Sequence, residues 1–148
     1  MKAIILLFLI GLTFSYDRSA AISYAKKYWQ NYNPKYANYK DQGGDCANFV
    51  SQCMIAGGFS FSSCSVSWRD SHGCLPRVRD LKSCLEQKGW KHSSSKPAAF
   101  KAGYPMFAKS HSHAMLATTV DGSTVKFAAH TTNYYDHKLS ESVDYYYP

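Results

Sequence analysis

The stretch over residues 43–52, GGDCANFVSQ, constrains this chain most, because a sharp loop in it runs directly into a helix. Gly43 and Gly44 permit the backbone angles that a tight turn needs, and Asp45 is a residue type favoured at a helix N-cap. Cys46 then falls at the first helical position. A thiol at the positive end of a helix dipole is expected to have a lowered pKa, so the stretch predicts a nucleophilic cysteine. The alternative is a small buried apolar residue or half of a disulfide.

The first 15 residues have the pattern of a secretory signal, with Lys2 before an apolar run from Ala3 to Leu12 and small residues after it. We therefore expect a secreted protein, or one in a lumenal compartment, with a single mature domain over residues 16–148. The formal net charge of +7 comes from scattered basic residues. Their pattern does not favour nucleic-acid binding, so anionic polymers are the expected partners. We expect a monomer without stable membrane insertion.

Five cysteines in an oxidising compartment leave at least one thiol unpaired. If Cys46 is a nucleophile, the other four can pair in more than one way. A disulfide between Cys64 and Cys74 would close the loop between them and leave Cys53 with Cys84 to join two helices. We prefer this pairing, although Cys53 lies on an apolar helix face and can instead be buried and reduced.

The order of the predicted elements indicates an α+β fold. Apolar periodicity predicts helices first and a meander of strands afterwards, so the helices are expected to pack on a small antiparallel sheet. The predicted helices cover residues 17–32, 46–56 and 76–88, and the predicted strands cover residues 104–108, 113–120, 123–130 and 143–147.

The hairpin between the two long strands selects two of the six histidines. Residues 121–122, Asp-Gly, are a strong signal for a two-residue turn. Direct pairing across that turn places His113 opposite His130, with Cβ atoms about 4.5–5.5 Å apart. One imidazole can then act as the base for Cys46 while the other fixes its tautomer. A β-bulge would change this register.

Two further expectations concern the histidines. His111 shares the strand face of His113 and is the rival base. These two histidines with Cys46 or His130 could hold zinc in principle, but the chain has neither a Cys-x-x-Cys pair nor a His-Glu-x-x-His motif. We therefore expect no metal and no cofactor.

Residues near the cysteine are candidates for an oxyanion hole and a substrate cleft. The backbone N–H of Cys46 at the helix start is a natural oxyanion donor, and the Gln42 amide is a second possibility. Tyr36 and Tyr39 precede the loop and can line a cleft, with Asp45 at its edge.

The stretch GGDCANFVSQC, followed by Ala-Gly-Gly at residues 56–58, resembles the core motif of a family of secreted amidases. That family belongs to the papain-like superfamily of cysteine peptidases and amidases, which includes the NlpC-like and CHAP-type cell-wall hydrolases. An N-terminal helix beginning near Tyr16 and the tripeptide Ala-His-Thr at residues 129–131 also resemble the family. Family members usually carry Gly-Asp before a central strand, where this chain has Gly103-Tyr104.

The resemblance implies a papain-like, NlpC-like fold and a cysteine mechanism with a thioester intermediate. It implies Cys46 as the nucleophile and His113 as the general base and acid. The third, orienting residue would be His130, as in NlpC-like relatives, or Asn133, as in papain-type enzymes.

The resemblance also implies a substrate class, a peptide or peptidoglycan, because small secreted members of the superfamily tend to cut peptidoglycan amides. Two alternatives stay open. One is a protein peptidase or transpeptidase, and the other is a catalytically idle module that binds glycan or cell wall.

Overall fold

The computed structural model describes residues 15–148, so nearly all of the predicted signal segment lies outside the described residues. The described part is α+β, as predicted, with helices first and strands after them. Within residues 15–148, no helix is long and apolar enough to cross a membrane. The elements are α1 (Arg18–Tyr28), α2 (Cys46–Ala56), α3 (Val78–Gln87), β1 (Lys91–Ser93), β2 (Pro105–Ala108), β3 (Ala114–Asp121), β4 (Thr124–Ala129), β5 (Tyr134–Lys138) and β6 (Val143–Tyr147).

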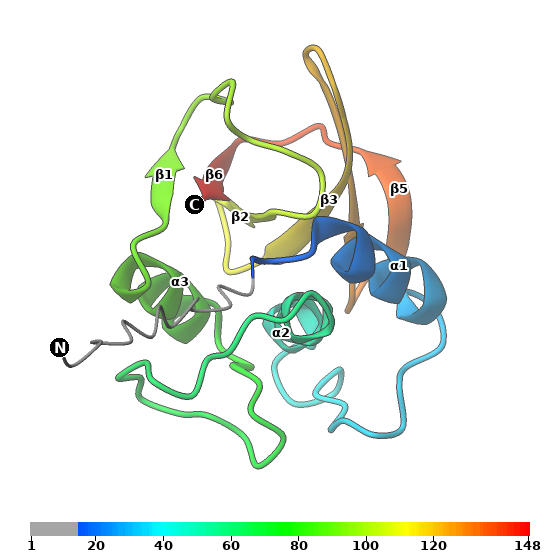
Figure 1. Cartoon of the computed structure of the whole chain (residues 1–148). Coiled ribbons are helices and arrows are strands. Elements are labelled where there is room, and N and C mark those ends of the chain that lie inside the picture. Colours follow the sequence, from blue (N-terminus) through cyan, green and yellow to red (C-terminus); the bar gives the residue numbers. More distant parts are fainter. Residues whose placement is uncertain (1–14) are drawn as a thin grey trace, which may run out of the picture.

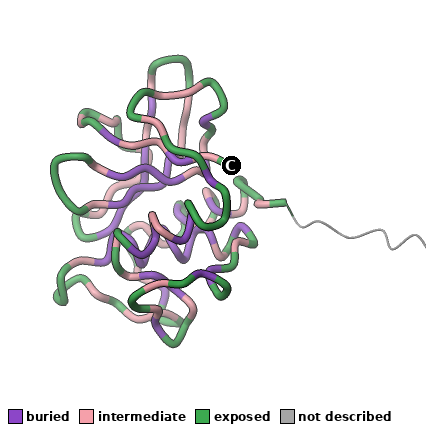
Figure 2. The backbone as a smooth tube through the Cα atoms, turned by 90° about the vertical axis from the view of Figure 1, so that its left-hand side faces the viewer, coloured by how far each residue is buried: buried purple, intermediate pink, exposed green. Residues whose placement is uncertain are grey.

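The strands form one antiparallel sheet in the order β1-β6-β2-β3-β4-β5. Figure 1 shows the helices gathered beside this sheet, with α2 between α1 and α3. The main core lies between the helices and the sheet, where Phe49 and Leu81 pack with Leu116. A second cluster includes Phe100 and Met115. Figure 2 shows buried segments running through the structure, and α2 is buried from Cys46 to Met54.

The helix ends follow local signals. The Asp17 carboxylate accepts a hydrogen bond from the Ala20 N–H at 3.0 Å, which is a regular N-cap. Helix α2 begins at Cys46, as predicted. Helix α1 ends at Tyr28, four residues before the predicted end at Tyr32. Strand β5 was not predicted, because its sequence YYDHK is polar and lacks alternation.

The β3–β4 hairpin differs from the predicted register. Asp121 pairs with Thr124, so the turn falls one residue later than expected. A β-bulge at Thr118 then shifts the pairing again. The hydroxyls of the neighbours Thr118 and Thr119 both donate to the Asp136 carboxylate, at 3.0 and 2.7 Å. Neighbours in a regular strand point to opposite faces, so this shared acceptor requires the bulge.

The prediction that His113 lies opposite His130 is therefore wrong. Leu116 pairs with Ala128, and the same register continued outward places Thr131 across from His113. A one-residue slip sends a side chain to the other face of a sheet. His113 and His130 therefore have different surroundings.

A buried hydrogen bond joins the loop before α2 to the end of β4. His130 is 1% exposed, and its Nδ1 lies 2.7 Å from the Asp45 carboxylate. Its Nε2 lies 2.8 Å from the Tyr28 carbonyl oxygen. A carbonyl oxygen only accepts, so His130 Nε2 donates to Tyr28. Tyr32 and Phe49 stack on the ring, each with centroids 3.8 Å apart, and exclude water from the pair.

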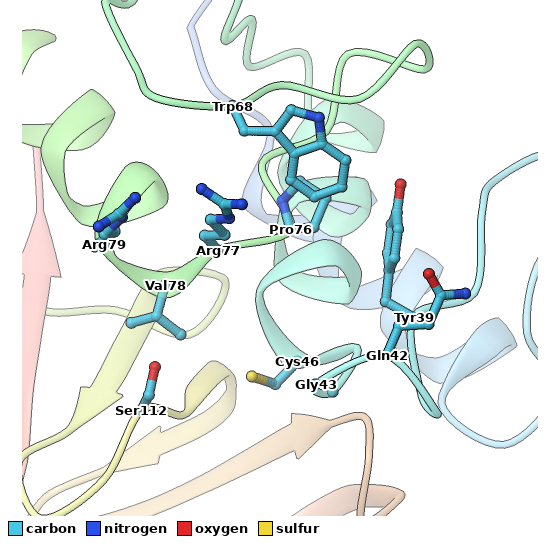
Figure 3. A pocket seen from close by; sticks show the side chains of 11 residues that line it. Tyr39, Gln42, Gly43, Cys46, Trp68, Pro76, Arg77, Val78, Arg79 and Ser112 are labelled. Carbon is cyan, nitrogen blue, oxygen red and sulfur yellow. The ribbon is translucent and has the colours of Figure 1, made fainter.

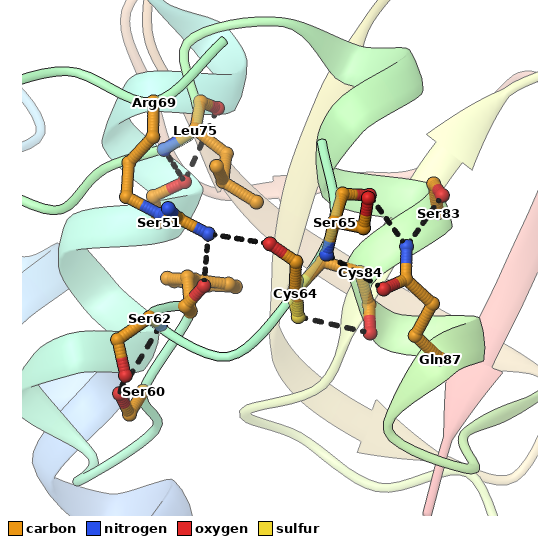
Figure 4. The surroundings of a disulfide bond; sticks show 11 residues. Ser51, Ser60, Ser62, Cys64, Ser65, Arg69, Leu75, Ser83, Cys84 and Gln87 are labelled. Atoms are coloured by element: carbon orange, nitrogen blue, oxygen red, sulfur yellow. Dashed lines mark hydrogen bonds between the residues drawn. A yellow bond between two sulfur atoms is a disulfide. The ribbon is translucent and has the colours of Figure 1, made fainter. Parts of the chain in front are cut away.

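The one disulfide among the described residues joins Cys64 to Cys84 (Figure 4). The predicted pairs Cys64–Cys74 and Cys53–Cys84 are therefore wrong, because Cys53 and Cys74 are buried thiols. The loop ending at Cys64 packs against α3, which carries Cys84, and this brings the two cysteines together. Arg69 holds the same loop by donating to the carbonyl oxygens of Phe61 and Cys64 at 2.6 and 2.8 Å.

We expect non-reducing peptide mapping to recover one linked peptide pair, Cys64 with Cys84. Replacing both residues with alanine should lower the free energy of unfolding by about 3 kcal/mol, because the bond closes a loop with a sequence separation of 20. Urea denaturation measures this loss. Recovery of a Cys64–Cys74 peptide would contradict the assignment.

The Asp45→Asn variant should lose about 1–3 kcal/mol of unfolding free energy, because its NH2 group replaces one carboxylate oxygen and leaves a buried donor without an acceptor. Urea denaturation at neutral pH is the measurement. The matched control is Asp41→Asn, which removes the same charge from an exposed position of the same loop. A loss as small as that of the control would show that the pair is not a structural clamp.

Candidate active site

Cys46 is the first residue of α2, and its position follows from the loop before it. Gly43 and Gly44 have φ angles of +98° and +108°, which side-chain-bearing residues rarely adopt. A Cβ atom on Gly44 would also come within 3.1 Å of the Thr131 hydroxyl oxygen. The Asp45 N–H donates to that hydroxyl at 2.8 Å. The loop thus turns sharply against the end of β4 and delivers Cys46 to the helix start.

The Cys46 sulfur is nearly enclosed, with the residue 9% exposed. Burial raises the pKa of the Cys46 thiol above its ordinary value. Hydrogen bonds from the backbone N–H groups of Ala114, Ala47 and Cys46 lower this pKa, and the Asp45 charge raises it. The net effect is a raised pKa, so the expectation of a lowered pKa is wrong. Cys46 is therefore a thiol at neutral pH and needs a base to become a nucleophile.

His113 immediately precedes β3 and lines the same cavity as Cys46, a space of about 350 Å³. Burial lowers the pKa of His113, the nearby His111 lowers it further, and Glu141 raises it. The net direction is down, so the imidazole is neutral at pH 7 and can accept a proton. His111 lies parallel to His113 with ring centroids 5.6 Å apart, and is exposed.

The predicted orienting residues do not lie with His113. Both nitrogens of His130 are engaged by Asp45 and Tyr28, so this ring has no acceptor to offer. Asn133 accepts a hydrogen bond from the Tyr32 hydroxyl at 3.0 Å and lines neither cavity beside Cys46. The acidic group on the cavity of His113 is Glu141, whose carboxylate also lies 3.7 Å from His111 Nδ1.

Asp45 neither caps α2 through its side chain nor lines the cleft. Its carboxylate is fully buried and accepts hydrogen bonds from the Tyr39 N–H and the Asn48 amide, each at 2.9 Å, in addition to His130. The carboxylate binds the histidine and not the helix N–H groups, because a donor that can carry charge binds a carboxylate more strongly. The expectation that Asp45 forms the cleft edge is therefore wrong, and the residue holds the loop instead.

Thr131 adds a strained contact at the same place. Its φ angle is +80°, which is rare for a β-branched residue. Such strain persists only where the surroundings impose it. Here the Thr131 hydroxyl accepts a hydrogen bond from the Asp45 N–H. The turn after β4 is thus shaped to hold the cysteine loop.

A larger cavity of about 460 Å³ opens on the other side of Cys46 (Figure 3). Gln42 and Tyr39 line it, as predicted, whereas Tyr36 does not and instead packs on His72. The Tyr39 hydroxyl donates to Asp70 at 3.1 Å, and burial together with the Asp70 charge raises the pKa of Tyr39 to about 12.

Sequence reasoning missed most of the other cavity residues, among them Trp68, Arg77, Arg79 and Glu141. They lie on surface segments far from the cysteine in the chain, and nothing in their spacing relates them to it. Among residues 15–148, no group of three His, Cys, Asp or Glu side chains is arranged to hold a metal ion. The chemistry available here is that of a thiol, a neutral imidazole and backbone donors.

Comparisons with known proteins agree with the motif. Residues 15–147 match a family described as "Putative amidase domain". A Bacillus subtilis (strain 168) protein named "Uncharacterized protein YhbB" is 40% identical over 89 residues, which cover 51% of this chain and 28% of that protein. The chain thus spans less than a third of this relative's length. No solved structure matches the chain. The family match extends over almost all described residues, so the chain belongs to this amidase domain family.

Proposed function

We propose that this protein is a cysteine-dependent amidase with Cys46 as the nucleophile and His113 as the general base and acid. The observation that carries the proposal is the shared cavity of the two side chains, with Cys46 at a helix start and backbone N–H groups around its sulfur. This arrangement is the one expected of a papain-like site, in which a cysteine at a helix N-terminus faces a histidine that opens a strand.

The proposed reaction begins with a neutral pair. His113 takes the proton from the Cys46 thiol as the sulfur attacks the carbonyl carbon of the amide. The tetrahedral intermediate then expels the amine, which receives that proton from His113, and a thioester remains on Cys46. Water attacks the thioester while His113 removes its proton. The carboxylic acid leaves, and the proton returns to the thiol.

The oxyanion is held, in this proposal, by the first N–H groups of α2. The N–H groups of Cys46 and Ala47 lie close enough to the sulfur to act on its pKa, so they also face the carbon that the sulfur attacks. The Gln42 amide lines the adjacent cavity and is the proposed side-chain donor. Glu141 favours the imidazolium that forms on His113 during the reaction.

We propose peptide amides, and first those of bacterial peptidoglycan, as the substrates of a secreted enzyme. The basic charge of the chain favours anionic cell-wall polymers. Purified peptidoglycan and casein separate this from a general peptidase, since new amines should be released from peptidoglycan and not from casein. Transfer of the acyl group to an added amine would identify a transpeptidase.

A binding module is the second candidate function. Trp68 is 37% exposed on the larger cavity, and its ring meets Tyr39 edge to face at 5.5 Å. Exposed aromatic side chains of this kind can bind sugar rings, and a thiol with a raised pKa is a weak nucleophile without its base. Retained binding to peptidoglycan with no release of amines by the wild-type protein would favour this function.

Replacement of the proposed pair should abolish hydrolysis without unfolding the protein. We expect Cys46→Ala to remove all measurable amine release, and His113→Gln to lower kcat by about 10²- to 10⁴-fold, the usual contribution of a general base. His92→Gln, on β1 away from the cavities, is the matched histidine control. Full activity in Cys46→Ala would refute the mechanism.

The pH dependence of Cys46 alkylation should show that Cys46 and His113 are both uncharged at neutral pH. The lowered pKa of His113 means that its active, unprotonated form is already present at pH 7 and is lost only as the pH falls below about 6.5. The rate of Cys46 alkylation by iodoacetamide should therefore rise through this acidic pKa in the wild type. In His113→Gln, the rate should rise only in the alkaline range, as the raised Cys46 pKa requires. Identical profiles would show that His113 does not serve Cys46.

A further inference from the structure

The two cavities that meet at Cys46 carry opposite charges. Both are lined by Gly43, Gly44 and Ser112 as well as the cysteine, so together they form one cleft with the sulfur in the middle. In the larger cavity the only charged lining residues are arginines, Arg77 and Arg79. In the smaller cavity the only carboxylate is Glu141.

The arginines are held in place beside the cleft. The Arg77 guanidinium carbon lies 5.4 Å from the centre of the Trp68 ring, and Arg79 donates to the Ser67 hydroxyl at 3.1 Å. Figure 3 shows Arg77 and Arg79 at the start of α3, with Trp68 beside Arg77 and Cys46 across the cavity. Among residues 15–148, neither arginine forms an ion pair with a carboxylate. Both guanidinium groups are thus available to an anion.

We call the larger cavity, with Arg77, Arg79 and Trp68, the arginine arm of the cleft. The chemistry of the arginine arm favours a carboxylate. Guanidinium groups present N–H donors in a planar fork that matches a carboxylate, and the flat ring of Trp68 supports the apolar chain that carries it. Helix α3 begins at Val78 with no side-chain cap on its N-terminus, which adds favourable potential for a negative group. A carboxylate placed in the other arm would instead meet Glu141.

We propose that the substrate amide is flanked, on the side of Arg77, Arg79 and Trp68, by a carboxylate that these arginines bind. The substrate class is therefore an acidic peptide or peptide-like amide with an asymmetric charge. This inference rests on the proposed function, since it assigns a direction to the cleft around Cys46.

Haloacetyl probes test the cleft without requiring turnover. Iodoacetyl derivatives of glycine, γ-aminobutyrate and ε-aminohexanoate carry a carboxylate at three distances from the reacting carbon, and their primary amides are neutral controls. The measurement is the ratio of Cys46 alkylation rates, carboxylate over amide, at low salt, with the labelled residue identified by mass spectrometry. We expect the best of the three carboxylates to react about fivefold faster than its amide, as an exposed ion pair allows.

Matched variants separate the effect of the two arginines on this ratio from the effect of the net charge of the protein. Arg77→Gln and Arg79→Gln should each lower the ratio, and the double variant should bring it to about one. The control is Lys101→Gln with Lys138→Gln, which removes two exposed charges that line neither cavity and should leave the ratio unchanged. A ratio near one for all three lengths in the wild type, or equal losses in the control, would overturn the proposal.

The probe experiment and the hydrolysis assay distinguish failure of this inference from failure of the amidase proposal. A carboxylate preference that depends on the arginines, with no hydrolysis of any amide, would support carboxylate binding by Arg77 and Arg79 and would refute the amidase proposal. Hydrolysis that requires Cys46, with no preference for carboxylate probes, would support the amidase proposal and would refute carboxylate binding by the two arginines.

Discussion

The contact between the Asp45 carboxylate and the His130 ring is the interaction on which the site depends. It joins the loop before α2 to the end of β4, two segments separated by 85 residues in the chain. Stacking by Tyr32 and Phe49 removes water, which strengthens the electrostatic attraction and makes an unpaired partner costly. A loop held in this way has one conformation, so the side chain after Asp45 has one position.

The contact between Asp45 and His130 also affects how Cys46 can react. A loop pressed against the sheet buries the sulfur, and burial raises the pKa of the thiol. The same packing brings His113 into the cavity and lowers the pKa of its imidazole. The two shifts oppose a preformed ion pair, and in the proposed mechanism they favour transfer of the proton at the moment of attack.

The sequence predicted features that depend on neighbouring residues and missed those that depend on distant ones. The start of α2 at Cys46, the Asp17 cap and the α+β order follow from local patterns. The hairpin register was wrong because the turn falls one residue later than the Asp-Gly signal indicates. The bulge at Thr118, held by Asp136 from a strand that was not predicted, reverses only half of that shift. The disulfide partner of Cys64 likewise depends on how a long loop packs on α3, which cysteine spacing does not reveal.

Asp45 marks the start of α2 correctly, but its side chain does not cap the helix. Aspartate before a helix is expected to accept hydrogen bonds from the first N–H groups, but here His130 is the stronger donor and takes the carboxylate. The N–H groups of Cys46 and Ala47 act on the sulfur. An ordinary cap accepts from the second or third helical N–H, here that of Ala47 or Asn48. Because Asp45 binds His130 instead, the Ala47 N–H stays beside the thiol, where the proposed mechanism needs a donor for the developing oxyanion.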